Sequence, residues 1–299
     1  MKRREFLYNS AGSLVLSLLA GKQLLAQSGM QETPYAMKEV RRGVSIFSEK
    51  GGTIAYLITK EGIVLVDSQF PEQSAHLISE LRKLSESSFK FLINTHHHGD
   101  HTSGNIAYKG LVEHVVAHKN SLANQQEVAK RNQNEEKQLY PDTTFSGSWQ
   151  VKIGPEQIRA YYFGEAHTNG DSMIHFENAN VVHLGDLLFN KRYPFIDRSA
   201  GASIKHWITV LDQAKRTFDA ETIYVFGHAF DPKAVTGSIT EVDSFKAYLE
   251  KLLSFVSGEI KAGKSKEEIL AATAIAGVQD MNGEPKHNLE MAYEELTEP

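Results

Sequence analysis

Short apolar runs separated by polar turns dominate the chain from residue 44 to residue 94. Residues 44–47, 54–59 and 63–67 are rich in apolar and β-branched residues, a composition that predicts β-strands. Pro71 then opens a segment whose apolar residues recur at helical spacing, which predicts an amphipathic helix. Residues 89–94 are the next predicted strand, so this half of the chain has a strand–helix–strand order.

A second stretch of the chain resembles the first. Strands are predicted at residues 151–153, 158–163, 173–176, 181–185 and 223–226, and a helix from about residue 202 to residue 218. Because strands alternate with helices, we expect an α/β fold built in layers. The polar residues 119–140, which lie between the two stretches, predict a surface helix and a loop without a functional role.

The C-terminal part is predicted to be helical. Apolar residues follow one helical stripe at Val242, Phe245, Leu249, Leu252 and Val256. Ser265 and Glu268 form a capping box that predicts the start of a second helix. The polar tail from Asp280 is expected to be loose. No linker rich in Gly, Ser or Pro divides the chain, so we expect residues 27–299 to form one domain.

The first 26 residues have the layout of an export signal, with a basic start, a short apolar run and an alanine at the predicted cleavage site, Ala26. The apolar run is short for a membrane span. Arg3 and Arg4 resemble the pair of a twin-arginine signal, while an ordinary secretory signal and an uncleaved anchor are the alternatives. We therefore expect a periplasmic or secreted protein without stable membrane association after cleavage.

Composition limits the classes of binding partner and the residue types that can serve as metal ligands. The chain is 41% hydrophobic and 23% charged, which is ordinary for a soluble globular protein, and its net charge of -5 argues against nucleic-acid binding. With no cysteine among 299 residues, disulfides and thiolate ligands are excluded, so a transition-metal site must use His, Asp and Glu. We expect a small-molecule substrate, and nothing in the sequence indicates an oligomeric state.

The densest group of potential metal ligands directly follows the predicted strand at residues 89–94. Four potential ligands stand within six residues there: His96, His98, Asp100 and His101. Three more follow other predicted strands: His167, Asp186 and His228. Imidazole and carboxylate groups suit zinc, and strand ends in an α/β sheet gather at the edge where ligands bind. We therefore expect the seven side chains to converge, the alternative being charged loops without a metal.

The motifs H-x-H-x-D-H, A-H-T-x-G-D, G-D and G-H, in this order, resemble the metallo-β-lactamase superfamily over roughly residues 44–228. The resemblance implies a four-layer αβ/βα sandwich with the active site on one edge. It also implies that one metal is held by His96, His98 and His167 and a second by Asp100, His101 and His228, with Asp186 bridging them. Zinc β-lactamases typically have Cys or Ser at the bridging position. Asp186 is instead similar to glyoxalase II-like and lactonase-like members, which weakens, without removing, the case for a β-lactam substrate.

The resemblance implies a hydrolase in which a hydroxide held between two zinc ions attacks an ester, lactone, thioester or β-lactam amide. Iron or manganese can also occupy such a site. Asp100 is the expected catalytic residue, orienting the hydroxide or accepting its proton. The alternatives are a mononuclear iron enzyme similar to persulfide dioxygenases and a non-enzymatic metal-binding protein. The full ligand set argues against the last, because a structural zinc site closes with four ligands.

Other residues are expected to support the centre. Asp67 and Asp171 are candidates for fixing the tautomers of the ligand imidazoles, with strand-end or turn capping as the alternative. His97 should point away from its two neighbours if the backbone is extended. His183 is expected to pack behind the site. Tyr193 and Phe195 either line the substrate entrance or only pack, and six histidines are expected to have no metal role: His76, His114, His118, His175, His206 and His287.

Overall fold

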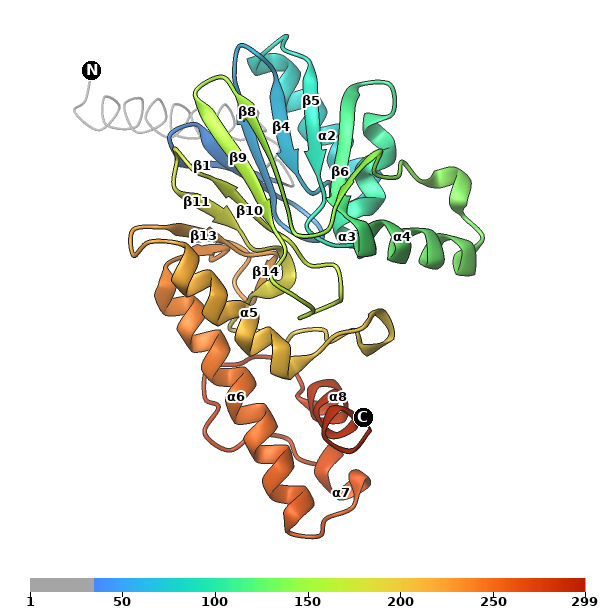
Figure 1. Ribbon diagram of the computed structural model, residues 1–299, viewed down its shortest axis with the longest axis vertical. Coiled ribbons are helices and arrows are strands. Elements are labelled where there is room, and N and C mark those ends of the chain that lie inside the picture. The colour runs from blue at the N-terminus through green and yellow to red at the C-terminus, as the bar shows by residue number, and fades with distance from the viewer. Residues whose placement is uncertain (1–34, 299) are drawn as a thin grey trace, which may run out of the picture. The chain divides into compact units, whose positions relative to one another are not determined.

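Two facing β-sheets form the centre of the computed structural model, which describes residues 35–298 (Figure 1). The first sheet has the order β1 (Ala36–Arg41), β2 (Val44–Ser48), β3 (Ile54–Ile58), β4 (Ile63–Val66), β5 (Phe89–Ile93), β6 (Val112–His118), β7 (Thr143–Phe145). The second has the order β15 (Thr236–Gly237), β13 (Ile223–Val225), β11 (Val181–His183), β10 (Met173–Phe176), β9 (Glu156–Tyr161), β8 (Ser148–Ile153). A short parallel pair joins β12 (Phe189–Asn190) to β14 (His228–Ala229).

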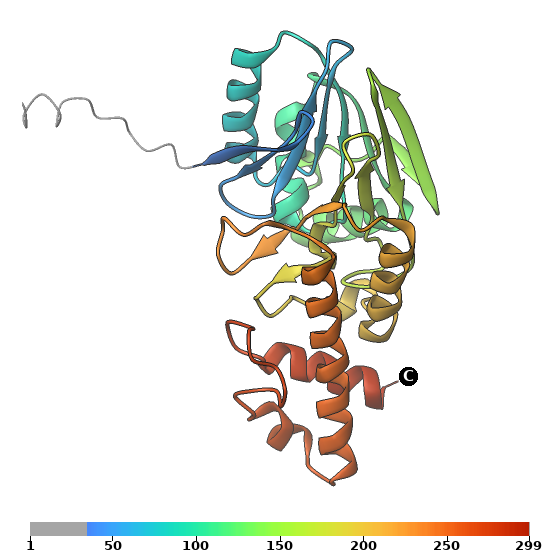
Figure 2. The same ribbon diagram turned by 90° about the vertical axis from the view of Figure 1, so that its left-hand side faces the viewer.

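Helices lie against the outer faces of these sheets, and the C-terminal helices extend beyond them (Figure 2). The α-helices are α2 (Pro71–Leu84), α3 (Gly99–Thr102), α4 (Lys119–Asn132), α5 (Ile204–Thr217), α6 (Ile239–Lys261), α7 (Lys266–Leu270) and α8 (Lys286–Thr297). Single 3-10 turns are η1 (Ser103–Tyr108), η2 (Glu135–Lys137), η3 (Gly185–Leu187) and η4 (Arg198–Ala200). Among residues 35–298, none of the helices combines the length and the apolar character that crossing a bilayer requires.

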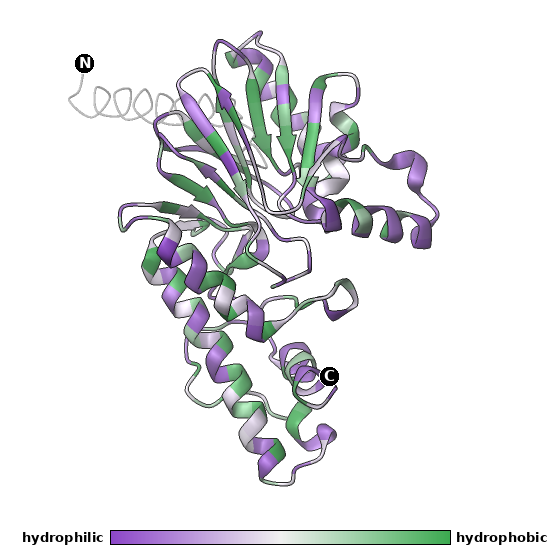
Figure 3. Cartoon of the chain, in the orientation of Figure 1, coloured by the Kyte–Doolittle hydropathy of each residue, from purple (hydrophilic) through white to green (hydrophobic). Residues whose placement is uncertain are grey.

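The layering follows from strands that are apolar on both faces. In β4, Val64 and Val66 belong to the core between the sheets, whereas Ile63 and Leu65 face the core under α2. All four side chains are buried because β4 lies inside, between its own helix layer and the opposite sheet. In Figure 3 the inner strands β4 and β5 are mainly hydrophobic, whereas the exposed helix α4 is mainly hydrophilic. The expected four-layer αβ/βα sandwich is therefore confirmed.

Most of the predicted elements are present, with differences among the strands and in the C-terminal tail. The strands β1 and β6 were not anticipated, because several of their positions are polar and exposed. The tail expected to be loose from Asp280 instead contains α8, which packs on α6 and α7 and buries Leu289 and Ala292 completely. That expectation was wrong because three buried residues recur on one face of an otherwise polar helix. The predicted export signal, residues 1–26, lies outside the described residues.

Packing of α8 predicts a stability effect at Leu289. Leu289→Ala should lower the free energy of unfolding by about 2–5 kcal/mol, because it removes a buried side chain and leaves a cavity. Lys286→Ala, at an exposed position in the same helix, is the matched control and should change stability by less than about 0.5 kcal/mol. Urea unfolding measures both changes. An unchanged midpoint for Leu289→Ala would mean that α8 contributes nothing to the fold.

Candidate metal centre

Four segments bring the predicted ligands together at one edge of the two sheets. The first sheet contributes the turn after β5, in which the chain stays extended to His98 and then enters the single helical turn α3. The second sheet contributes His167 from the loop between β9 and β10 and Asp186 from the turn after β11. His228, at the start of β14, follows its strand β13 closely in the chain. Thus the seven residues expected from the sequence do meet, although 132 positions separate the first from the last.

One set of side chains, called the first ligand group, comprises His96, His98, His167 and Asp186. Nδ1 of His98 lies 3.1 Å from Nε2 of His96 and 2.9 Å from Nε2 of His167. Oδ2 of Asp186 lies 3.5 Å from Nε2 of His167. Three imidazole nitrogens and a carboxylate oxygen therefore face a common point.

The second ligand group comprises Asp100, His101 and His228. Nε2 of His228 lies 3.0 Å from Oδ2 of Asp100 and 3.4 Å from Nε2 of His101. Asp186 also reaches this group, since its Oδ1 lies 3.0 Å from Nε2 of His101 and its Oδ2 lies 3.5 Å from Nε2 of His228. A carboxylate that touches both groups is what the bridging role of Asp186 requires.

The residues present fit a pair of divalent cations. Oδ1 of Asp186 is buried and lies 3.0 Å from Nε2 of His101, but the two atoms are not in hydrogen-bonding geometry, although buried carboxylate oxygens normally have a partner. Two glycines let the backbone approach the ligands closely. A Cβ on Gly52 would lie 2.1 Å from the His101 ring, and one on Gly227 would lie 2.1 Å from Oδ1 of Asp186. Nitrogen and carboxylate oxygen atoms without sulfur are a donor set that zinc, iron or manganese accepts.

The outward nitrogens of the imidazoles have their own partners. Nδ1 of His96 lies 3.0 Å from Oγ1 of Thr95, and Nδ1 of His167 lies 2.7 Å from the carbonyl oxygen of Phe195. Nε2 of His98 lies 3.0 Å from Oδ2 of Asp197. Such contacts fix the tautomer and the ring orientation of a metal-binding histidine. Each ring therefore presents its other nitrogen to the ligand groups.

Asp67 has the same function for His101, and it also anchors the ligand turn. Its Oδ2 lies 2.8 Å from Nδ1 of His101, while Thr95 donates to it from the backbone nitrogen and the hydroxyl, each at 2.8 Å. Asp67 is fully buried at the end of β4 and has φ +65°, a left-handed conformation that Asp tolerates better than most residues. The prediction that Asp67 supports an imidazole agrees with this geometry.

Burial and neighbouring charges set the protonation of the two groups. Burial lowers the pKa of His96 well below its usual range and that of His167 to about 3, so both are neutral lone-pair donors. Burial opposes protonation of His228 as well, but the Asp186 charge and the hydrogen bonds that His228 donates to Asp100 and Asp186 raise its pKa to about 9. A cation bound at the second ligand group would replace such a proton, so binding there releases protons.

Other predicted residues have different positions. Asp171 accepts hydrogen bonds from the backbone and the hydroxyl of Thr168, at 2.7 and 2.9 Å, and among the described residues it bonds to no ligand imidazole. It therefore matches the alternative prediction, turn capping. His97 belongs to neither ligand group, and its Nε2 lies 3.7 Å from Asp197. His183 packs behind the site as expected and accepts a hydrogen bond from Gly185, next to Asp186.

The centre opens into a cavity of about 600 Å³. Tyr193 and Phe195 line it, in agreement with the sequence analysis, and Phe195 is 51% exposed. His287 and Asn288 of α8 line it as well, although no role was expected for either. Asp197 was also missed, because 99 residues separate it from His98 and no local motif marks the contact.

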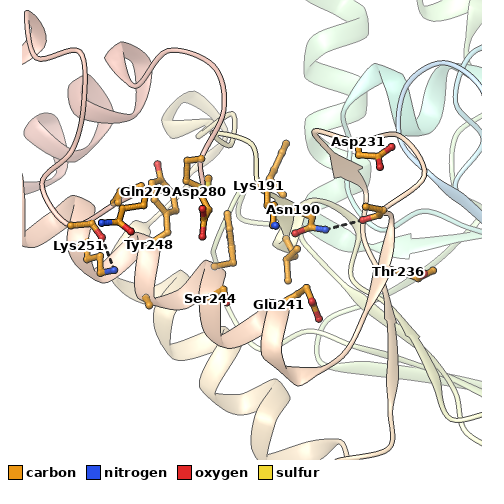
Figure 4. A pocket seen from close by; sticks show the side chains of 18 residues that line it. Asn190, Lys191, Asp231, Thr236, Glu241, Ser244, Tyr248, Lys251, Gln279 and Asp280 are labelled. Carbon is orange, nitrogen blue, oxygen red and sulfur yellow. Dashed lines mark hydrogen bonds between the residues drawn. The ribbon is translucent and has the colours of Figure 1, made fainter.

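A second cavity, of about 660 Å³, lies away from the ligands. Figure 4 shows Glu241, Ser244, Tyr248 and Lys251 following α6 along this cavity. Of the described residues that line it, Phe189 alone also lines the cavity above the ligands. None of the seven predicted ligands borders this second cavity. We therefore expect substrate to bind in the cavity above the ligands.

Comparison with protein families gives one match, to a family described as the metallo-beta-lactamase superfamily, over residues 50–228. Among curated proteins, a metallo-beta-lactamase of Chryseobacterium indologenes is 23% identical over 190 residues, which cover 62% of this chain and 75% of that protein. A type 2 metallo-beta-lactamase of Elizabethkingia meningoseptica is 23% identical over 197 residues, covering 66% of this chain and 76% of the relative.

Solved structures share the fold at lower identity. A metallo-beta-lactamase from Pontibacter korlensis has a TM-score of 0.61 and 20% identity, and the match covers 72% of this chain and 99% of that one. A double mutant of a sec-alkyl sulfatase has a TM-score of 0.70 and 14% identity, and the match covers 88% of this chain and 50% of that one. The second match covers more of this chain than the first. Part of the chain outside the region shared with the β-lactamase therefore also has a structural counterpart.

The contacts of Asp67 predict a specific loss of metal affinity. Asp67→Asn should weaken metal binding at the second ligand group by about 10–100-fold, because His101 loses the carboxylate that orients it. Competition with a chromogenic chelator measures the affinity. Asp142→Asn, which alters an exposed Asp–His pair with a separation of 3.2 Å, is the matched control and should bind metal like the wild type. Equal affinities for all three proteins would refute the role assigned to Asp67.

Proposed function

Because the chain belongs to the metallo-β-lactamase superfamily, we propose that it is a hydrolase that binds two metal ions, zinc in the first instance, and cleaves a small carbonyl-containing substrate. One observation carries the proposal: two ligand groups share the buried carboxylate of Asp186 at the base of an open cavity. A structural metal site needs neither a second group nor access from solvent. The arrangement therefore supports catalysis over a purely structural role.

The position of each side chain determines which of the two ions it would bind. His96, His98 and His167 would hold one ion and Asp100, His101 and His228 the other, with Asp186 between them. When bound, such ions lower the pKa of a coordinated water to about 7 and polarise a carbonyl oxygen. The protein contributes fixed imidazole orientations, because Asp67 and Asp197 hold the outward nitrogens of His101 and His98.

Asp100 is the proposed catalytic residue. Its side chain is 30% exposed and lines the cavity, whereas that of Asp186 is only 4% exposed. Burial alone would raise its pKa, but the charge of His101 and the hydrogen bond from His228 lower it to about 2. Asp100 is therefore ionised at neutral pH, and its carboxylate can orient an attacking water and accept the proton that this water gives up.

The cavity also limits the size and the chemical character of the substrate. A volume of about 600 Å³ suits a small molecule rather than a polymer or a folded protein. The exposed ring of Phe195 offers an apolar surface beside the ligands. An ester, a lactone, a thioester or a β-lactam amide meets both conditions.

Metal content should separate this proposal from its main alternative. Purified full-length protein is expected to contain two zinc ions per chain and to lose hydrolysis after removal of metal by a chelator, with recovery when zinc is returned. Elemental analysis and a panel of substrates measure this: nitrocefin, a homoserine lactone, a thioester, a 4-nitrophenyl ester and a secondary alkyl sulfate. One iron per chain with oxygen consumption on a persulfide would instead indicate a dioxygenase. Bound metal without turnover of any panel member would favour a non-enzymatic protein.

Substitution at the ligands should abolish turnover and preserve the fold. Asp100→Ala and His98→Ala are each expected to lower kcat/KM by at least about 100-fold, because each removes a ligand of one ion. His114→Ala, which changes an exposed histidine on the first sheet, is the matched control and should keep wild-type turnover. Near-normal activity of Asp100→Ala with a normal circular dichroism spectrum would contradict the assignment.

A further inference from the structure

Two partners of the ligand imidazoles lie on one irregular segment, residues 191–203, between β12 and α5. The carbonyl oxygen of Phe195 accepts from Nδ1 of His167, and Oδ2 of Asp197 faces Nε2 of His98. Both histidines belong to the first ligand group. Because the segment contains no strand to fix it, its position has to come from elements packed against it.

Two consecutive residues of α8 bind the peptide groups on either side of Phe195. Asn288 donates from Nδ2 to the carbonyl oxygen of Pro194 at 2.6 Å. Nε2 of His287 lies 3.2 Å from the backbone nitrogen and 3.1 Å from the carbonyl oxygen of Ile196, and the ring of His287 stacks on that of Phe195 at 4.9 Å and 6°. The carbonyl of Phe195 belongs to the second of these peptide groups, and Asn288 holds the first. Contacts from α8 therefore help to set the direction of this carbonyl toward His167.

The other end of the segment is held by the same helix. Glu295 of α8 accepts from the backbone nitrogens of Ile204 and Lys205 at 2.7 and 2.9 Å. These are first-turn N–H groups of α5, which have no acceptor within their own helix. Oε2 of Glu295 also lies 3.8 Å from Arg198. One helix therefore contacts the segment before and after Asp197. The backbone nitrogens of Asp197 and Ser203 add hydrogen bonds to the carbonyl oxygens of His167 and Ala166, at 3.2 and 3.0 Å.

We propose that His287 and Asn288 are positioning residues of the first ligand group, acting through the Phe195 carbonyl on His167. The inference rests on the metal-binding role proposed above. A carbonyl oxygen can only accept, so it keeps the proton of His167 on Nδ1 and leaves the lone pair of Nε2 for a cation. Both residues lie beyond residues 50–228, which the family match covers, so the C-terminal helix supplies this support.

The test measures zinc affinity without substrate, in a full-length His228→Ala background that disables the second ligand group. Competition with a chromogenic chelator gives the affinity of the first group, and Co²⁺ absorption reports its geometry. His287→Ala and Asn288→Ala are each expected to weaken binding by about 10-fold and to shift the Co²⁺ spectrum, because an outer partner of a ligand is lost. His287→Gln keeps an acceptor for Ile196 and should bind more tightly than His287→Ala.

Glu290→Gln is the matched control, since Glu290 lies on α8 but pairs with Lys266 of α7 at 3.0 Å rather than with the segment. It should bind zinc like the background protein. Unchanged affinity in both alanine variants, or equal weakening in all α8 variants including Glu290→Gln, would overturn the inference. If Asn288→Ala does not fold, the ranking of His287→Ala below His287→Gln decides. The proposed function fails separately, if the wild-type chain does not bind two ions.

Discussion

Hydrogen bonds to the carboxylate of Asp67 connect the ligand turn to the end of β4, and the rest of the candidate centre depends on this connection. A fully buried charge is tolerated only when its oxygens are satisfied, and here Thr95 and His101 satisfy them. The same bonds fix the start and the end of the ligand turn against the end of β4. The turn itself is short and irregular, so its four ligands depend on such contacts with the surrounding scaffold for a common orientation.

Local patterns predicted what depends on neighbours in sequence. The double-sided apolar run of β4 and the ligand spacing after β5 are visible in a few residues, and they led to the layered fold and to the seven side chains. Contacts between distant segments could not be predicted in this way. Asp197 meets His98 across 99 positions, and His287 meets Ile196 across 91, with no composition signal at either end. The one local sign of α8 in the sequence was the spacing of the apolar residues Leu289 and Ala292 within the polar tail.

The two ligand groups are consequently supported in different ways. His101, in the second group, takes its outward contact from Asp67 in the adjacent strand layer. His98 and His167, in the first group, take theirs from the 191–203 segment, which a C-terminal helix holds in place. The surroundings of the first ligand group therefore depend on residues outside the ligand motifs, whereas those of His101 depend on a strand within the region that the family match covers.

The split origin of the ligands has a mechanical consequence. His96 to His101 follow a strand of one sheet, whereas His167, Asp186 and His228 follow the strands β9, β11 and β13 of the other. Ions shared between them would act as a cross-link between the two halves of the sandwich. Since a ligand that binds only the folded state stabilises it by mass action, the protein's resistance to heat and proteolysis would rise and fall with the supply of metal around it.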